Sequence, residues 1–257
     1  MTFPQQDLPG FNTTLRPEAA PQWLKGVIDH PRSIQRRLEG TMQERTLPAN
    51  PSRAAAVLML LSGSAGSASG STPEALPDDA AVLLTHRSPS LRSHSGQIAF
   101  PGGRIDPGDT NVVDAALREA WEETGLDRRA VVPLAQLDAV EIRVSGNPVH
   151  PVVGYWDASA DVGVIDPGEA DDVFLTPLAE LVDPRNRVRL VMGPWMGPGF
   201  WVRDYLVWGF TGGLLSALFT QAGWERPWAD APVMGLDEAI ARSRNNEPHY
   251  WGAEPRG

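Results

Sequence analysis

The stretch from Phe100 to Leu126, FPGGRIDPGDTNVVDAALREAWEETGL, decides the expected fold and the expected site. It opens with a Pro-Gly-Gly turn, which lets backbone approach a ligand closely. Residues 109–111 (Asp-Thr-Asn) then offer three candidate N-cap oxygens for a helix, and Gly125 suits the left-handed position just after its end. The spacing predicts a loop, a helix and a second loop that form one rigid unit.

Three glutamates in this helix are expected on one face. Glu119, Glu122 and Glu123 are spaced i, i+3 and i+4, and Arg118 is four residues before Glu122 and can pair with it. Three like charges repel one another, so the face needs a positive group. A solvated acidic face is the plain alternative, but carboxylate oxygens on a rigid scaffold are what Mg²⁺ or Mn²⁺ binds. We therefore expect a metal site here.

A small basic cluster lies just upstream of the turn. Arg87, Arg92 and His94, with His86 nearby, stand out in a chain of net charge −10. Arginine binds phosphate through a planar fork of donors, whereas a lone surface arginine usually pairs with a carboxylate. Beside a carboxylate site for a metal, the cluster favours phosphate binding.

Composition limits the class of protein. The chain has 257 residues, of which 42% are hydrophobic, as expected of a soluble globular protein. It has no cysteine, which excludes disulfides, thiolate zinc sites and cysteine nucleophiles. The net negative charge argues against nucleic acid as a partner. The longest apolar run, residues 205–219, is too short to span a bilayer, and residues 1–23 lack a signal-peptide pattern, so cytoplasm is the expected location.

The order of expected elements indicates an α+β protein. Residues 1–20 are expected to be a loose arm, and a flexible Gly/Ser segment (63–74) joins two early strands. The tail is expected to be irregular apart from a short helix. The expected strands and helices are strands at 53–63 (where the alanines and leucines also allow a helix), 80–88, 131–145 and 148–159, a strand and short helix at 171–186, a strand and buried helix at 203–224, and the tail helix at 235–243. The expected division is 1–50, an arm with a helical extension; 51–223, the main domain; and 224–257, a tail packed on it.

The glutamate helix resembles the Nudix box, the signature of hydrolases that cleave a nucleoside diphosphate linked to another moiety. The residues that match its second half are Arg118, Glu119, Glu122, Glu123, Gly125 and Leu126. The first half departs from the pattern. Gly103 and Arg118 are one residue further apart than usual, and the glutamate expected within the loop is missing, with Asp106 or Asp109 as the nearest candidate.

A second motif narrows the resemblance. LLTHRSPSLRSHSGQIAFPGG, residues 83–103, resembles the sequence that marks the coenzyme A pyrophosphatase branch of Nudix hydrolases, in which the longer loop is common. Its fixed positions are Leu83, Leu84, Thr85, Arg87, Arg92, Gly96, Phe100, Pro101, Gly102 and Gly103. The resemblance implies the Nudix fold, an α/β/α sandwich with a mixed sheet and the Nudix loop-helix-loop.

The resemblance also implies the reaction and its residues. Coenzyme A would be cleaved at its P–O–P bond to 4′-phosphopantetheine and adenosine 3′,5′-bisphosphate, with Mg²⁺ or Mn²⁺ as cofactor. The implied roles are metal ligation by Glu119, Glu122 and Glu123, catalysis by Glu119, Glu122 and Arg118, and substrate binding by Arg87, Arg92, His94, Gly102 and Gly103. The general base is left open between Glu119 and an acid of a later loop, with Glu169, Asp171 and Asp172 as candidates.

Two alternatives remain at this level. One is a Nudix hydrolase of another nucleoside diphosphate derivative, such as ADP-ribose or a dinucleotide. The other is a Nudix-fold sensor that binds a nucleotide without cleaving it, against which the intact glutamate cluster argues. The expected partner is a small nucleotide of the coenzyme A type, without nucleic acid or membrane, and a homodimer would be ordinary for the family.

Overall fold

The computed structural model describes residues 8–29, 34, 54–65, 76–141, 147–157 and 161–248. The helices of these residues are α1 (Lys25–Ile28), α3 (Val112–Thr124), α4 (Leu178–Val182), α5 (Gly209–Ala222) and α6 (Leu236–Arg242). The strands are β1 (Ala55–Ser62), β2 (Ala81–Arg87), β3 (Ile98–Ala99), β4 (Gly102–Arg104), β5 (Val131–Gln136), β6 (Val140–Glu141), β7 (Pro148–Trp156), β8 (Ala170–Pro177), β9 (Arg187–Met192), β10 (Trp195–Val202), β11 (Tyr205–Val207) and β12 (Val233–Gly235). None of the helices in this part of the chain has the length and apolar character that crossing a membrane requires.

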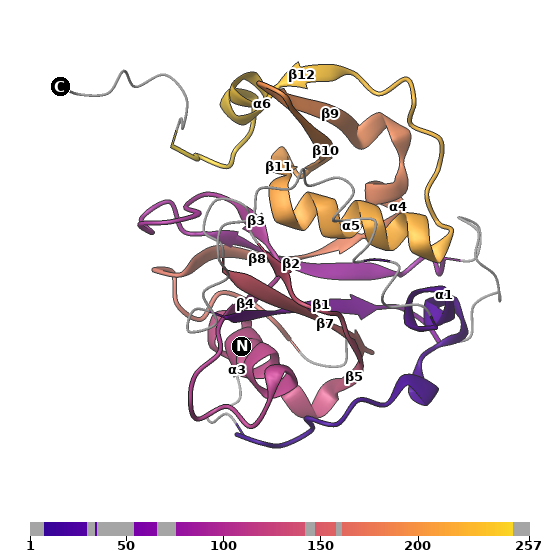
Figure 1. The fold of residues 1–257 in the computed structure, drawn as a ribbon, viewed down its shortest axis with the longest axis vertical. Coiled ribbons are helices and arrows are strands. Elements are labelled where there is room, and N and C mark those ends of the chain that lie inside the picture. Colours follow the sequence, from indigo (N-terminus) through magenta and orange to yellow (C-terminus); the bar gives the residue numbers. More distant parts are fainter. Residues whose placement is uncertain are drawn as a thin grey trace.

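The main sheet is mixed, as expected. Its central order is β3-β2-β1-β7-β5, while β4 pairs with β1, β6 with β7 and β8 with β2 (Figure 1). β1 and β7 run parallel along their whole length, from Ala55 beside Val149 to Ser62 beside Trp156. The other pairs of this sheet are antiparallel.

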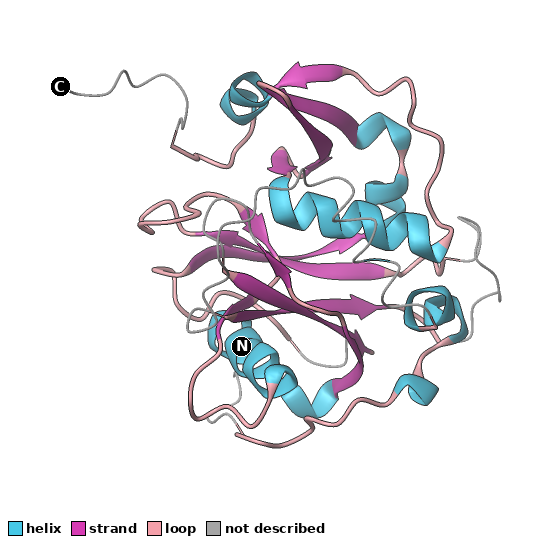
Figure 2. Cartoon of the chain, viewed as in Figure 1, coloured by secondary structure: helices cyan, strands magenta, loops and turns pink. Residues whose placement is uncertain are grey.

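Helices cover both faces of the main sheet (cyan in Figure 2). Side chains alternate along β1, so Leu58 and Leu60 join the core that contains α3. Met59 and Leu61 point the other way, into the core that contains α1 and α5. This two-sided burial explains why residues 53–63 form a continuous apolar run, and it confirms the α/β/α sandwich and the α+β class.

β1 and β2 separate where the stretch from Phe100 to Leu126 begins. They pair only at Leu61 with Val82 and at Ser62 with Ala81. Beyond that point β2 pairs with β3, whereas the first half of β1 pairs with β4. The chain crosses between these two arms at Phe100 and Pro101, and the Pro101 carbonyl accepts a hydrogen bond of 2.8 Å from the Leu58 amide. The Pro-Gly-Gly turn therefore lies at the fork of the sheet.

A smaller sheet lies on the other side of α5 (Figure 1). Its order is β11-β10-β9-β12, and β12 joins β9 in parallel. The prediction of an irregular chain before the tail helix was wrong, because residues 233–235 form β12. The three-residue strand has no periodicity of its own and exists through its pairing with β9. The domain boundaries at residues 50 and 223 remain a prediction.

The loose arm is a second correction. Residues 8–20 dock along the sheet, where the Asn12 side-chain amide donates to the Arg128 and Val131 carbonyls at 2.7 and 2.6 Å. The Arg16 amide donates to the Pro133 carbonyl at 2.8 Å. These bonds pair the arm with segments more than a hundred residues away, so local sequence carries no sign of them.

Candidate active site

α3 carries the predicted glutamates and has the caps that the sequence suggested. The Asn111 side chain accepts a hydrogen bond from the Asp114 amide at 2.9 Å, so Asn111 is the N-cap among the three candidates. Gly125 ends the helix with φ of 70°, and its amide donates to the Trp121 carbonyl. These two caps fix the register that places Glu119, Glu122 and Glu123 near one another.

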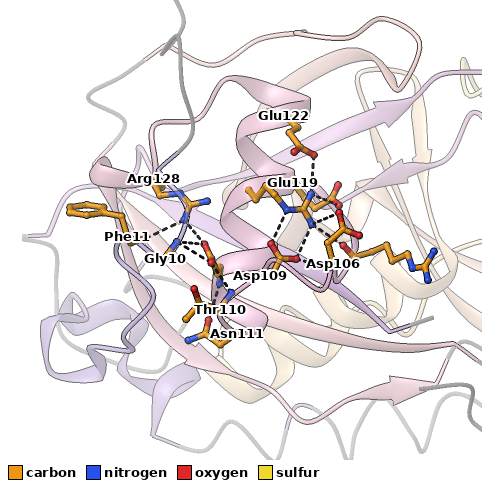
Figure 3. Close-up of polar contacts among 12 residues, drawn as sticks. Gly10, Phe11, Asp106, Asp109, Thr110, Asn111, Glu119, Glu122 and Arg128 are labelled. Carbon is orange, nitrogen blue, oxygen red and sulfur yellow. Dashed lines mark hydrogen bonds and ion pairs between the residues drawn. The ribbon is translucent and has the colours of Figure 1, made fainter. Parts of the chain in front are cut away.

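Arg118 joins the helix to the loop before it, and its partners Asp109, Glu119 and Glu122 are labelled in Figure 3. Its Nη1 donates to Glu119 and to Glu122, each at 3.0 Å. Its Nε and Nη2 donate to the two oxygens of Asp109 at 2.8 and 3.0 Å, and Nη2 also reaches the Arg104 carbonyl at 2.9 Å. The expected pairing with Glu122 is present, but Arg118 also holds Glu119 and the loop.

Asp109 takes the place of the missing loop glutamate. Its side chain is only 4% exposed, and it receives both arms of the Arg118 fork. Burial would raise the pKa of Asp109, but the hydrogen bonds from Arg118 and the Asp106 amide, together with the Arg118 charge, outweigh it, so that pKa lies below its usual range. Asp106, the other candidate, is 58% exposed and 4.0 Å from Arg118 Nη2. The sequence offered both residues, and the tertiary structure distinguishes them.

The two glycines of the turn contact two of the glutamates in different ways. A Cβ on Gly103 would lie 2.4 Å from a carboxylate oxygen of Glu119. The Gly102 amide donates to Glu123 Oε2 at 3.2 Å. Both predicted substrate-binding glycines thus serve to hold carboxylates against β4, and their contact with substrate remains a prediction.

Glu123 is a buried carboxylate, and Glu119 is partly buried, with 14% of its side chain exposed. Burial raises the pKa of Glu119 to about 7 and that of Glu123 to about 8, although Arg118 and Arg87 respectively oppose the change. The charge of exposed Glu169, from the loop before β8, adds to both increases. The Glu169 charge therefore acts on both helix glutamates, and the role of Glu169 as the general base remains a prediction.

Arg87 is the cation that reaches this region from β2. Its Nη1 is 3.7 Å from Glu123 Oε1. Among the described residues, no hydrogen-bond partner meets its buried Nε. A guanidinium beside the carboxylates with an unused donor suits an incoming phosphate oxygen.

The rest of the predicted basic cluster divides between two environments. Arg92 is exposed in loop 88–97, the connection between β2 and β3. In the same loop His94 adopts a left-handed φ of 54° and its Nδ1 lies 3.0 Å from Gln97 Oε1. His86, which the sequence places near this cluster, is buried and bonded to Asp171. Side-chain alternation along β2 turns it to the opposite face from Arg87.

The donor atoms of this site are chemically suited to a metal ion, but they are not arranged around a common point. Within the described ranges, no three or more His, Asp or Glu side chains form a group arranged to hold a metal ion. Glu122 is 40% exposed and bound to Arg118, while Glu119 and Glu123 pack against β4. All the donors are carboxylate oxygens, which hard divalent cations prefer, and a dication would offset the two buried charges. The ligand role of the three glutamates remains a prediction.

Comparison with known proteins agrees with this geometry. Residues 75–196 match the family model described as the NUDIX domain. The chain is 38% identical over 158 residues to the uncharacterized Nudix hydrolase NudL of Klebsiella pneumoniae, covering 55% of this chain and 75% of that protein. It is 39% identical over 155 residues to NudL of Escherichia coli, with the same coverage. A crystal structure of the M. smegmatis Nudix hydrolase RenU superposes with a TM-score of 0.40 and 22% identity, over 52% of this chain and 76% of that one.

The family match spans the turn at Gly102–Gly103, the glutamate helix and the loop that carries Glu169. The two relatives extend that likeness over more than half of the chain. This chain belongs to the Nudix hydrolase family.

Proposed function

We propose that this hydrolase cleaves the P–O–P bond of coenzyme A or its derivatives, using Mg²⁺ or Mn²⁺, to give 4′-phosphopantetheine and adenosine 3′,5′-bisphosphate. One observation carries the proposal: partly buried Glu119 and buried Glu123 pack against the Gly102–Gly103 turn beside Arg87, whose Nε has no partner in the described part of the chain. Such a site combines oxygen ligands for a cation with a donor for phosphate.

The residues divide the work between binding, positioning and proton transfer. Arg87 binds a phosphate oxygen, and Arg92 and His94 from loop 88–97 bind further phosphate groups. Glu119, Glu122 and Glu123 would hold the metal, which when bound supplies charge neutralisation and a more acidic water. Arg118 acts as a positioning residue that orients Glu119 and Glu122.

In the reaction, a water oxygen forms a bond to one phosphorus and the bond from that phosphorus to the bridging oxygen breaks. The bridging oxygen leaves on the second phosphate group, and the proton of the water passes to a carboxylate. The preferred bases are Glu119 and Glu169, whose charge acts on Glu119, over Asp171 and Asp172, which bind His86 and Tyr205. Coenzyme A is favoured over ADP-ribose or a dinucleotide by the motif at residues 83–103, every fixed position of which is present.

The first test is product analysis of the purified protein with coenzyme A and either metal, with ADP-ribose run beside it. We expect metal-dependent release of adenosine 3′,5′-bisphosphate from coenzyme A, and slower cleavage of ADP-ribose. Cleavage of ADP-ribose alone would overturn the coenzyme A assignment and keep the glutamate site. Tight nucleotide binding without any cleavage would favour the sensor.

Glu122→Gln tests the glutamate helix in the same assay. The change removes a charge at nearly constant volume from a half-exposed side chain, so the fold should persist while turnover falls by about 10²-fold or more, of the order seen when a charged catalytic group is removed. Glu238→Gln, on the exposed face of α6, is the matched control. Turnover of Glu122→Gln equal to that of the control would remove the metal-helix argument.

A further inference from the structure

A short segment after α6 crosses the active-site side of the molecule. We call residues 244–247 the strap. Burial alternates along it, because Asn245 and Glu247 are buried while Asn246 is exposed. Buried polar side chains are unfavourable unless hydrogen bonds compensate them, so this alternation indicates a docked segment.

The side chains of the strap form hydrogen bonds with β11 of the smaller sheet and with the residue that follows it. The Asn245 side chain accepts from the Leu206 amide at 2.8 Å and donates to the Leu206 carbonyl at 2.9 Å. Glu247 accepts from the Trp208 indole at 2.8 Å and from the Asn245 side-chain amide at 2.6 Å. Asn245 thus completes a strand-like pair with β11, and Glu247 is held by two buried donors.

The strap then reaches loop 88–97. The His86 Nε2, at the end of β2, lies 2.9 Å from the Asn245 carbonyl. Gln97, at the other end of the loop, donates to Glu247 at 3.2 Å. A Cβ on Gly96 would lie 2.3 Å from the Asn245 carbonyl, so loop and strap backbones touch.

Loop 88–97 depends on such restraint. Its sequence, SPSLRSHSGQ, contains one large apolar residue, Leu91, which is only partly buried. Its other end is anchored by the Ser88 amide, which donates to the Glu169 carbonyl at 2.9 Å. The loop that presents Arg92 and His94 is therefore held between the strap and the loop of Glu169.

We infer that Asn245 and Glu247 are positioning residues that hold loop 88–97 in its substrate-binding conformation, so that the strap sets substrate affinity. The inference rests on the proposed function, since Arg92 and His94 act on substrate only if that function holds. A restrained loop loses less conformational freedom when substrate binds than a free one does. Loss of the strap contacts should raise KM and leave kcat nearly unchanged, because α3 and its carboxylates are not touched.

The test compares Glu247→Ala with Glu247→Gln and with Asn246→Gly. The glutamine keeps one acceptor oxygen and most of the volume, so it should restore most of the wild-type behaviour. Asn246 is exposed and has a φ of 56°, which glycine adopts freely, so Asn246→Gly is the matched control in the same segment.

The first readout is hydrogen exchange, which needs no substrate. In the wild type the Arg87 amide donates to the Gln97 carbonyl and the Gly96 amide to the Arg87 carbonyl, each at 2.9 Å. In Glu247→Ala we expect faster exchange at these amides and unchanged exchange in α3. Unchanged exchange at Arg87 and Gly96 would overturn the inference, whether or not the protein cleaves coenzyme A.

The second readout is steady-state kinetics with coenzyme A and Mg²⁺. We expect KM of Glu247→Ala to rise roughly tenfold, equivalent to about 1.4 kcal/mol of binding, with kcat within about twofold of wild type. A fall in kcat at constant KM would overturn the inference. A wild type that cleaves neither coenzyme A nor ADP-ribose would sink the proposed function, and the exchange result would still decide whether the strap holds the loop.

Discussion

At the scale of single residues, two aspartates three positions apart have different fates. Asp109 is buried and binds both arms of the Arg118 fork, whereas Asp106 is exposed at the edge of the same loop. The fork geometry lets Asp109 fix the plane of the guanidinium, and that plane directs Nη1 toward Glu119 and Glu122. One buried carboxylate thereby orients two proposed metal ligands.

Asp109→Asn should therefore lower activity, although Asp109 has no contact with substrate in the proposed mechanism. An amide accepts only one arm of the fork, so Arg118 loses its fixed plane. We expect kcat to fall by about 10- to 100-fold, as for other residues that orient metal ligands. The measurement is kcat with saturating metal, and Asp106→Asn is the control, expected within about twofold of wild type. Equal activities of the two variants would mean that Asp109 does not orient the site.

At the scale of the element, α3 is anchored at its first turn by Asp114, whose partners Gly10, Thr110 and Arg128 are labelled in Figure 3. This carboxylate is 2% exposed and accepts from the Arg128 guanidinium at 2.5 Å, the Thr110 amide at 2.9 Å and the Gly10 amide at 3.0 Å. Burial would raise the pKa of Asp114, but the hydrogen bonds from Thr110, Arg128 and Gly10 outweigh it and lower that pKa. The docked arm thus reaches the helix that carries the glutamates.

Asp114→Asn should destabilise the fold by about 3 kcal/mol at pH 7, because it leaves the buried Arg128 charge without its carboxylate. The folded pKa of Asp114 is lowered, so its contribution is present above the unfolded value of about 3.9 and is lost as the pH falls through the folded pKa. Urea unfolding of the wild type and of Asp114→Asn at pH 7 and at pH 3 measures the difference between their free energies of unfolding. That difference should be smaller at pH 3. A difference that does not change with pH would contradict the role of the charge.

The caps of α3 were open to prediction because they are local. Asn111 and Gly125 act within four residues of their partners, and each residue type has its own preference for that position. The spacing of Glu119, Glu122 and Glu123 was equally local. Their different environments were not, since β4 buries Glu119 and Glu123 and leaves Glu122 half-exposed.

At the scale of the whole molecule, negative charge dominates both the chain and its site. The net charge is −10. In the partly buried site, the charge of Glu169 makes the charged forms of Glu119 and Glu123 less favourable, and the charge of Glu119 does the same to Glu123. A phosphate-rich substrate would add further negative charge there. Binding and folding should therefore both depend on a divalent cation.

Metal should accordingly raise the melting temperature. At a metal concentration about 100 times its Kd, the folded state gains about 2.7 kcal/mol. We expect this rise for the wild type and for Glu238→Gln in calorimetry with Mg²⁺ or Mn²⁺. Glu123→Gln should start from a higher melting temperature without metal, because it removes a carboxyl group whose charged form is disfavoured by burial, and should respond less to metal. A full metal response in Glu123→Gln would exclude Glu123 as a ligand.

The sequence by itself determined the α+β class, the glutamate helix with its caps, and the apolar strands β1 and β2, because each depends on preferences and periodicities within a short window. It also offered Asp109 and Glu169, but only among alternatives. The tertiary structure alone decided that Asp109 holds Arg118, that residues 8–20 dock, and that the strap at residues 244–247 touches loop 88–97. Those contacts join segments distant in the chain, and they exist only after the sheets and helices have packed.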